Sequence, residues 1–500
     1  MKCTILCNMN FSRAEADKRI FGSFAEHMGR VIYSGIYEPG HPQADVHGFR
    51  MDVMQAVQDM GVSCMRYPGG NFVSNYDWRD GVGPREERPH KLELAWRSIE
   101  TNEFGTNEFL RWAKLAKTEP ILAVNLGTRG IEDAVRYLEY INFPGGTQYS
   151  DLRREHGFEK PYGVKLWCLG NEMDGAWQIG HKTAVEYGRL AAETGKAMKL
   201  VESGIELIAC GSSKSDIDTH PQWDMTVLEH VYGIADYLAL HQYYGGQEKG
   251  IAGFLAQSAD FETYIHTVRS CITVTKQKLR SKAPMYISVD EWGVWPKALE
   301  TVALELDQAQ WQTAPAISEQ IYTLEDALLF ASMLMAMVRN ADIVKIACQS
   351  LVANISACIM TERGGGLWKQ TIYYPFQWMA QYARGTILQT VAKIPVYDVA
   401  GITVPVIDSL LIWNRELSQI IVFTVNRHDT EKAQISCTLQ QFDPKAVLEN
   451  TTLFAAERNQ TNEHCHQAVV PRKNGEALLK GDTLTVECEP LSFTMVRVQI

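Results

Sequence analysis

Short apolar, β-branched runs alternate with amphipathic, helix-like segments between about residue 20 and about residue 350 of this 500-residue chain. The pattern repeats eight times, and such repetition is typical of a parallel barrel. The candidate strands are Phe21–Phe24, Cys64–Tyr67, Ile121–Asn125, Val164–Leu169, Leu207–Cys210, Tyr237–His241, Met285–Val289 and Ile343–Ala347. The sequence therefore predicts an α/β fold built on a (β/α)8 TIM barrel.

Apolar residues at helical spacing between these runs support this prediction. The helical spacing becomes weaker toward the C-terminus. The helix-like segments between the runs include Phe49–Met60, Phe109–Ala116, Thr183–Val201 and Ile321–Arg339. After about residue 375, short alternating runs separated by Asn, Asp and Gly dominate, which predicts an antiparallel, jelly-roll-like β-sandwich. The expected domains are residues 1–15, an N-terminal strand that joins the sandwich, residues 16–375, the barrel, and residues 376–500, the C-terminal β-sandwich.

Charge and composition narrow the class of partner. The net charge of −11 and the isoelectric point near 5.7 argue against nucleic acid or an anionic membrane as the main partner. No apolar run reaches about 18 residues, so no membrane span is expected. The first residues do not resemble a signal peptide. We expect a cytoplasmic protein.

The cysteine pattern agrees with a reducing compartment. The chain holds 11 cysteines and no C-x-x-C pair, so a structural zinc site is not expected. Several lie inside apolar runs and are interpreted as small buried hydrophobic residues; they are Cys64, Cys168, Cys210 and Cys348.

Two of the candidate strands end in glutamates. Glu172 follows the fourth run, in Gly170-Asn171-Glu172, and Glu291 follows the seventh, in Asp290-Glu291-Trp292. Catalytic groups of a barrel collect at the C-terminal ends of its strands, and glycoside hydrolysis needs two carboxyl groups from different positions. We expect Glu172 to be the general acid, with a pKa raised by partial burial. Glu291 is the expected nucleophile, ionised and held by a donor such as Tyr243 or Arg66.

Polar and aromatic side chains recur at almost every other strand end, which predicts a pocket for a hydroxyl-rich ring. The Asn171 amide is suited to bind a sugar 2-hydroxyl, a contact that strengthens in an oxocarbenium-like transition state. The other expected substrate-binding residues are Glu26, Arg66, Asn71, Trp177, His241, Tyr243, Trp295 and Gln349.

Structural roles compete with these interpretations. A glutamate at a strand end is commonly a solvated loop residue, although the matching barrel positions favour catalysis here. A structural ion pair is a serious alternative for Arg66, and a core role for His241 and Tyr243. The tryptophans divide between core packing and sugar stacking; they are Trp78, Trp96, Trp177 and Trp295. His41 and His47 have no nearby ligand cluster and are interpreted as surface loop residues.

Six long segments carry a resemblance to a known family. They are Phe21–Arg30, Gly35–Gly40, Arg66–Phe72, Asp80–Pro89, Asn125–Gly130 and Trp167–Gly175. Together they resemble bacterial α-L-arabinofuranosidases of glycoside hydrolase family 51. The resemblance runs from about residue 18 to about residue 380 and is weaker in the sandwich.

The resemblance implies a retaining exo-acting enzyme that releases terminal α-L-arabinofuranosyl residues from arabino-oligosaccharides, such as fragments of arabinan and arabinoxylan, by double displacement. It implies Glu172 as acid/base and Glu291 as nucleophile, with no metal or cofactor. It also implies that Glu26, Asn71, Asn171 and Tyr243 line the subsite for the terminal furanose, and that Trp177 contacts the aglycone. A homo-oligomer, commonly a hexamer, is expected by analogy.

The chain departs from the family pattern close to the expected pocket. Leu351 stands where the family has glutamine, Gly293 where it has asparagine, and Asn75 where it has glycine. These changes leave the exact sugar and linkage open. The alternatives are a related retaining glycosidase acting on another furanoside, such as a galactofuranoside, or on a pyranoside, and a sugar-binding protein without catalysis.

Overall fold

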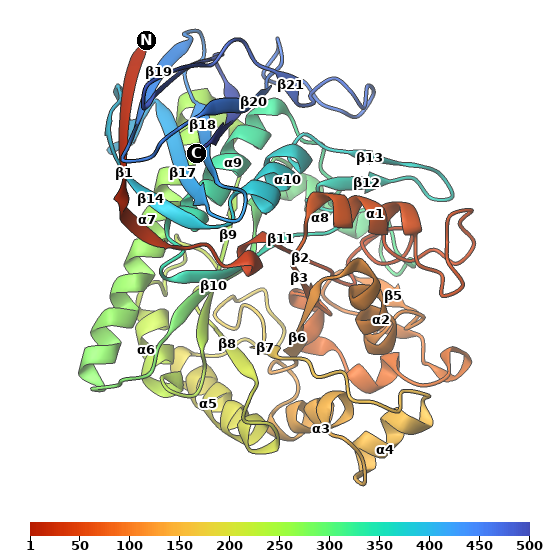
Figure 1. Cartoon of the computed structure of the whole chain (residues 1–500). Coiled ribbons are helices and arrows are strands. Elements are labelled where there is room, and N and C mark those ends of the chain that lie inside the picture. The colour runs from red at the N-terminus through yellow and green to blue at the C-terminus, as the bar shows by residue number, and fades with distance from the viewer.

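The computed structural model describes the backbone of residues 1–500 and all side chains but that of Gln247. Within that description, eight parallel strands close a barrel in the order β10-β11-β2-β3-β6-β7-β8-β9 (Figure 1). The strands are β2 (Gly22–Phe24), β3 (Cys64–Tyr67), β6 (Glu119–Val124), β7 (Leu166–Leu169), β8 (Glu206–Cys210), β9 (Tyr237–Tyr244), β10 (Tyr286–Val294) and β11 (Val344–Ser350). Each overlaps one of the predicted runs, so the (β/α)8 prediction is confirmed.

Helices surround the barrel and begin and end at residues suited to those positions. The side chain of Thr183 accepts a hydrogen bond from the Glu186 amide at the start of α5, and Thr323 does the same at the start of α9. Gly61 ends α1 with a φ of 84°, which favours glycine. The helices are α1 (Met51–Met60), α2 (Thr106–Ala116), α3 (Ile131–Asn142), α4 (Gln148–Glu155), α5 (Ala184–Val201), α6 (Gln222–Val231), α7 (Gly250–Lys278), α8 (Leu299–Gln308), α9 (Leu324–Arg339) and α10 (Tyr373–Tyr382). Short 3₁₀ helices cover Lys18–Phe21, Asn71–Asn75, Trp78–Gly81, Arg85–Glu87 and Gln247–Lys249.

The sandwich is built from both ends of the chain. In the described chain its ten strands run in the order β21-β20-β24-β18-β17-β14-β1-β19-β23-β22. The first of them in sequence, β1, pairs antiparallel with β14 and parallel with β19, and Figure 1 shows the red β1 beside the blue β19. The strands are β1 (Lys2–Glu15), β14 (Thr386–Lys393), β17 (Ile407–Asn414), β18 (Gln419–Asn426), β19 (Ala433–Gln440), β20 (Ala446–Leu453), β21 (Arg472–Lys473), β22 (Leu478–Lys480), β23 (Thr483–Cys488) and β24 (Ser492–Gln499).

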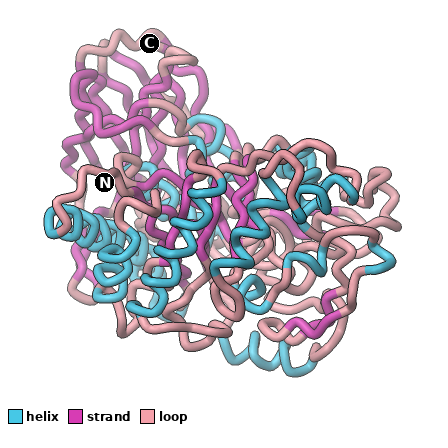
Figure 2. The backbone as a smooth tube through the Cα atoms, turned by 90° about the horizontal axis from the view of Figure 1, so that it is seen from below, coloured by secondary structure: helices cyan, strands magenta, loops and turns pink.

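One strand of the sandwich joins the two cores. All residues of β18 are buried, although strands of a sandwich commonly alternate buried and exposed positions. Ile421 and Phe423 belong to the large core that includes the barrel, whereas Ile420 and Val422 belong to the core inside the sandwich. Strand β18 also contacts α9. The sandwich is therefore packed firmly against the barrel, at one end of the molecule (Figure 2).

Three hairpins project from this frame. They are β4–β5 (Lys91–Glu93 and Ser98–Glu100), β12–β13 (Ile359–Thr361 and Leu367–Lys369) and β15–β16 (Val396–Val399 and Ile402–Pro405).

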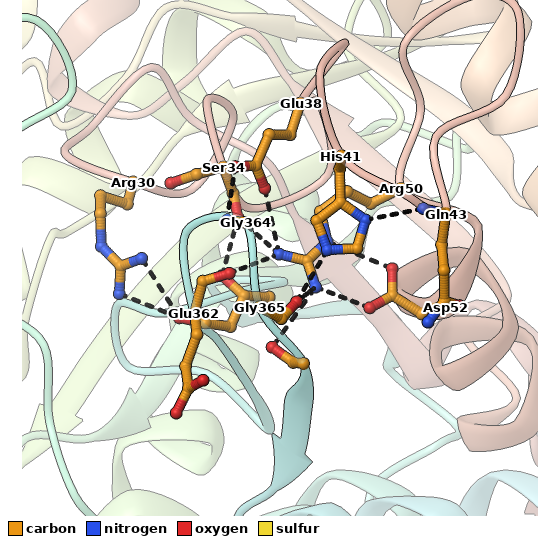
Figure 3. Close-up of polar contacts among 12 residues, drawn as sticks. Arg30, Ser34, Glu38, His41, Gln43, Arg50, Asp52, Glu362, Gly364 and Gly365 are labelled. Carbon is orange, nitrogen blue, oxygen red and sulfur yellow. Dashed lines mark hydrogen bonds and ion pairs between the residues drawn. The ribbon is translucent and has the colours of Figure 1, made fainter.

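A buried arginine fixes the loop after β2 to the β12–β13 hairpin (Figure 3). The guanidinium of Arg50 forms ion pairs with Asp52 at 2.6 Å and with Glu38 at 3.2 Å. It also donates hydrogen bonds of 2.9 Å to the carbonyl oxygens of Glu362 and Gly365. Because these partners come from segments more than 300 residues apart in the chain, the cluster locks the two loops together.

The interpretation of His41 as a surface residue was wrong. Its side chain is buried, its Nε2 lies 2.7 Å from the carbonyl oxygen of Gly365, and its Nδ1 accepts a hydrogen bond from the Gln43 amide. The reason is the packing of its loop against the hairpin, a long-range contact. His47 is only partly exposed, and its Nδ1 lies 3.1 Å from Arg111 Nη1.

The prediction that Cys64, Cys168, Cys210 and Cys348 are buried is confirmed. All 11 cysteines are free thiols and all but Cys465 are buried. Across the described chain, no helix is both long enough and apolar enough to cross a membrane.

Candidate active site

Both predicted catalytic glutamates lie at the C-terminal edge of the barrel. Glu172 follows β7, and its φ of 44° places its backbone in the left-handed region, which side-chain-bearing residues seldom adopt. Glu291 lies in β10, paired in register with His241 of β9. The register between these strands shifts between Ser288 and Glu291, which is typical of strands that re-aim a side chain beside a site.

His241 brings the two glutamates together. Its Nδ1 lies 2.9 Å from Glu172 Oε1 and 3.7 Å from Glu291 Oε2. A carboxylate oxygen from each glutamate and a ring nitrogen of His241 all lie within 4.8 Å of one another. Burial alone would lower the pKa of His241, but the charge of Glu291 and hydrogen bonds with Asp290 and Glu172 outweigh it and raise the pKa to about 10. The imidazole is therefore a cation at neutral pH.

Arg66, from β3, is a second buried cation. Its Nη1 donates a 3.1 Å hydrogen bond to Glu291 Oε2, and its Nη2 donates a 2.6 Å bond to Asn171 Oδ1. Its Nε lies 3.3 Å from Asp290 Oδ2. Burial raises the pKa of Asp290, but the charges of Arg66 and His241 reverse this effect and keep the pKa below its usual range. Arg66 thus has both the structural ion pair and the direct contact with Glu291 that the sequence left as alternatives.

Glu291 has a second hydrogen-bond donor, on β9. The Tyr243 hydroxyl donates a 2.9 Å hydrogen bond to Glu291 Oε1, so both carboxylate oxygens are occupied by donors. Burial and the nearby Glu172 carboxylate outweigh the opposing effects of His241, Arg66 and the Tyr243 hydrogen bond, so the pKa of Glu291 is raised.

Glu26 lies across Gly70 from Glu291. Its Oε1 accepts hydrogen bonds from the Phe72 amide at 3.0 Å and from Trp96 Nε1 at 3.1 Å. Burial, together with the charge of Glu291, raises the pKa of Glu26 to about 8. A Cβ atom on Gly70 would lie 3.0 Å from Glu291 Oε2 and 3.4 Å from Glu26 Oε2. Glycine at position 70 therefore keeps the space between the two carboxyl groups open.

The remaining predicted site residues are held in different ways. Asn71 Oδ1 lies 3.5 Å from Asn171 Nδ2, which brings these two amides together. Trp177 donates from Nε1 to Glu172 Oε2 at 2.6 Å, and Trp295 packs edge-on against the Tyr243 ring. Gln349 is fully buried, and its Nε2 donates to the carbonyl oxygens of Ser350 at 2.7 Å and Ser356 at 2.5 Å.

Trp78 is a core residue. It is buried and stacks on Tyr137 with ring centroids 5.1 Å apart.

Glu172, His241 and Glu291 have the spacing of a metal-binding group among the described residues. However, Arg66 already donates to Glu291 Oε2, and Trp177 already donates to Glu172 Oε2. The donor set therefore fits a hydrogen-bonded acid–base cluster better than a metal centre.

Known families match most of the chain. Residues 56–250 match the α-L-arabinofuranosidase 1 domain, and residues 290–492 match the α-L-arabinofuranosidase C-terminal domain. An intracellular exo-α-(1→5)-L-arabinofuranosidase of Halalkalibacterium halodurans is 47% identical over 499 residues, covering 100% of this chain and 99% of that protein. The chain belongs to the α-L-arabinofuranosidases of glycoside hydrolase family 51. It is thus a retaining glycoside hydrolase, and the galactofuranoside alternative is not favoured.

Solved structures of this arabinofuranosidase family share the whole fold. A family 51 α-L-arabinofuranosidase from Bifidobacterium longum superposes with a TM-score of 0.94 at 38% identity, covering 99% of both chains. An α-L-arabinofuranosidase from Thermotoga maritima, solved as an arabinose complex, gives a TM-score of 0.88 at 29% identity, covering 100% of both chains.

Sequence reasoning left three residues of this arabinofuranosidase out of the predicted site. Asp290 precedes the nucleophile candidate and pairs with Arg66, but a buried aspartate cannot be told from a solvated one by its neighbours in sequence. Trp96 was only one of four ambiguous tryptophans. Gly70 was noted only as part of Arg66–Phe72, and its closeness to Glu26 and Glu291 depends on the fold.

The three departures from the family pattern have distinct surroundings. Gly293 pairs in register with Tyr243, and a Cβ atom there would meet nothing closer than 3.5 Å, so there is room for a Cβ atom at this position. Leu351 is buried in the core beyond β11. Asn75 lines a cavity of about 40 Å³ beside the β4–β5 hairpin.

Proposed function

We propose that this enzyme releases terminal α-L-arabinofuranose by double displacement, with Glu291 as nucleophile and Glu172 as acid/base. The observation that carries the proposal is the short separation of the two carboxylates, whose nearest oxygens lie within 4.8 Å with His241 between them. A retaining enzyme needs carboxyl groups about 5–5.5 Å apart, whereas an inverting enzyme needs about 6.5–9.5 Å to admit a water molecule.

The donors around each carboxylate support this division of roles. Glu291 accepts from Arg66 and Tyr243, which stabilise the ionised form that a nucleophile needs. In the first step a Glu291 oxygen bonds the anomeric carbon, the bond to the leaving oxygen breaks, and that oxygen takes the proton of Glu172. In the second step water gives a proton to Glu172, its oxygen bonds the anomeric carbon, and the ester to Glu291 breaks.

The terminal furanose is proposed to lie between Glu26 and the Asn71–Asn171 pair. Burial of Glu26 raises its pKa to about 8, so at neutral pH it is a neutral carboxyl group that can donate as well as accept a hydrogen bond. Asn171 Oδ1 is held by Arg66, which leaves its amide N–H groups to face Asn71 and a sugar hydroxyl. Tyr243, Trp295 and Gln349 complete the proposed substrate-binding set.

The preferred linkage is proposed to be α-(1→5) in arabino-oligosaccharides. Two relatives with that printed specificity, from Halalkalibacterium halodurans and Bacillus subtilis, are each 47% identical to this chain. A second candidate is the α-(1→6) linkage, because a Bifidobacterium longum exo-α-(1→6)-L-arabinofuranosidase is 40% identical over 506 residues. Parallel kcat/KM measurements on the two arabinobioses separate these candidates.

We further propose that the enzyme acts in the cytoplasm as a homo-oligomer, a hexamer by analogy with the family. The names of the first relatives, which describe intracellular enzymes, support the location. Light scattering after size-exclusion chromatography tests the oligomer. The division of the chain at residues 15 and 375 stays a prediction.

The test of the catalytic roles compares wild-type, Glu172→Ala and Glu291→Ala proteins on an aryl α-L-arabinofuranoside, with Glu416→Gln, an exposed turn residue, as control. Both alanine variants should lose most turnover. Azide should rescue Glu172→Ala with an α-configured glycosyl azide and Glu291→Ala with a β-configured one, as read by NMR. Wild-type turnover in either variant would refute its assigned role.

A further inference from the structure

The two oxygens of Glu172 are held by donors of very different solvent exposure. His241 Nδ1 lies 2.9 Å from Oε1, and Trp177 Nε1 donates a 2.6 Å hydrogen bond to Oε2. His241 is 4% exposed and also contacts Asp290 and Glu291, whereas Trp177 is 49% exposed. One donor is fixed in the barrel, and the other lies on the surface.

The loop that carries Trp177 is pinned on both sides of the indole. Gln178 Nε2 donates to Ser74 Oγ, and the Lys182 amide donates a 2.9 Å hydrogen bond to the Met173 carbonyl oxygen. A Cβ atom on Gly175 would lie 2.4 Å from the Trp177 ring, so the indole rests directly on a backbone without a side chain. The indole can therefore turn away about its own side-chain bonds while the loop stays in place.

The indole donor conflicts with the role of a general acid. A general acid must bring one of its oxygens to the leaving oxygen, but His241 holds Oε1 and Trp177 holds Oε2 of Glu172. One donor must therefore leave before the proton is transferred. His241 is fixed by its buried partners, so Trp177 is the donor free to leave, and its departure opens Oε2 to a ligand from the solvent side.

The other charged or titratable groups around Glu172 are not free to leave it. His241 and Tyr243 face it from β9 and Glu291 from β10, and all three are fixed by one another. Asp174, in the same loop as Trp177, is held by the amide and hydroxyl of Ser213.

We propose that Trp177 is a displaceable positioning residue: its indole N–H holds Glu172 Oε2 in the resting enzyme, and the sugar of the leaving group displaces it, so that Glu172 becomes a proton donor only when an aglycone is bound. The inference rests on the proposed acid/base role of Glu172. Displacement of Trp177 would couple binding of the aglycone to the release of Glu172 Oε2. Glu172 would then donate its proton only when a leaving group is correctly placed.

The test compares pH profiles of wild-type enzyme, Trp177→Phe and Gly175→Ala on an α-(1→5)-linked arabinobiose, whose sugar leaving group needs the proton. Trp177→Phe keeps a ring but removes the donor, and Gly175→Ala keeps the tryptophan but pushes the indole off Glu172. In both variants the alkaline limb of kcat/KM, which reports the free enzyme, should move up by about one pH unit. The alkaline limb of kcat, which reports the bound complex, should not move.

Trp413→Phe is the matched control, because Trp413 is partly exposed in β17 of the sandwich and packs on Phe442. A kcat/KM profile of wild-type shape in both Trp177→Phe and Gly175→Ala would refute the displaceable donor, as would equal shifts of the kcat and kcat/KM limbs. Glu172→Ala measured in the same series separates the two proposals. If azide rescues that variant while the profiles stay unchanged, the acid/base assignment stands and only the role of Trp177 falls.

Discussion

The two catalytic glutamates are held in contrasting ways. Glu291 is held by groups that the barrel strands fix: Arg66 on β3 and Tyr243 on β9 donate hydrogen bonds to it, and His241 on β9 forms an ion pair with it. Glu172 shares His241 but has its second donor, Trp177, on a loop and half exposed to solvent. The comparison indicates that the surroundings of Glu291 are fixed, whereas those of Glu172 can change when a substrate binds.

The chemistry of the two steps accounts for this asymmetry. A nucleophile performs one task on a sugar ring that is always the same, so rigid preorganisation of its charge is favourable. An acid/base must lose and regain a proton and must meet different leaving groups. Rigid strands suit the first requirement, and a side chain on a loop suits the second.

The largest effect is expected when the groups that hold Glu291 lose the Arg66 cation. Arg66→Met removes the partner of Glu291, Asp290 and Asn171 and leaves Asp290 buried beside a single cation. We expect kcat to fall about 1,000-fold and the free energy of unfolding to fall by about 3–5 kcal/mol. Steady-state kinetics and urea unfolding measure both. Arg154→Met, at an exposed ion pair with Glu159, is the control, and an equal loss there would refute the argument.

The shared histidine comes next. His241→Gln should lower kcat about 100-fold, because the cation between the glutamates is lost. The pKa of His241 is raised to about 10, so its stabilising charge is fully present below the pKa of an unfolded histidine, near 6.5, and is lost as the pH rises toward 10. In wild-type protein, Tm should decline between pH 7 and 10. The decline should be smaller in His241→Gln and unchanged in His464→Gln, a control at an exposed histidine. Parallel curves for all three proteins would contradict the assignment.

Glu26 should also make the folded protein less stable as the pH rises. The reason differs, because Glu26 is an acid with a raised pKa. Its carboxyl group stays protonated in the folded protein up to about pH 8, whereas in the unfolded chain it ionises near pH 4.5. Folding therefore loses stability as the pH rises from about 4.5 to about 8. Glu26→Gln, which mimics the neutral form, should remove about 3–4 kcal/mol of that decline in urea unfolding at pH 5 and pH 8. A decline equal to that of wild type would show that Glu26 is ionised when folded.

The smallest expected effect is on substrate binding, and it tests the contact between the β4–β5 hairpin and Glu26. Trp96 donates to Glu26 from the turn of β4–β5, where Glu93 fixes it by accepting the amides of Ala95 and Trp96. Trp96→Phe should raise KM about 5-fold with little change in kcat, since one hydrogen bond behind a binding residue is lost. Initial rates across a range of arabinobiose concentrations measure this. A loss confined to kcat would place Trp96 in the chemical step instead.

The periodic part of the molecule was predictable from sequence. The eight barrel strands, the helices between them and the sandwich strands follow from local apolar spacing, which is written in neighbouring residues. Glu172 and Glu291 could be found because each follows a buried run, and strand ends of a parallel barrel meet at one face. Asp290, Trp96 and Gly70 could not, because their contacts join segments far apart in the chain.

The sequence by itself determined the fold class, the family and the two carboxylates that lie at the strand ends. Only the tertiary structure decided which groups hold them: Arg66 and His241 as buried cations, His41 as a buried link between loops, and Trp177 as the exposed donor to Glu172. The physical reason is that periodicity is a local property of the chain. Burial, charge pairing and the direction of a donor depend on residues brought together only when the barrel closes.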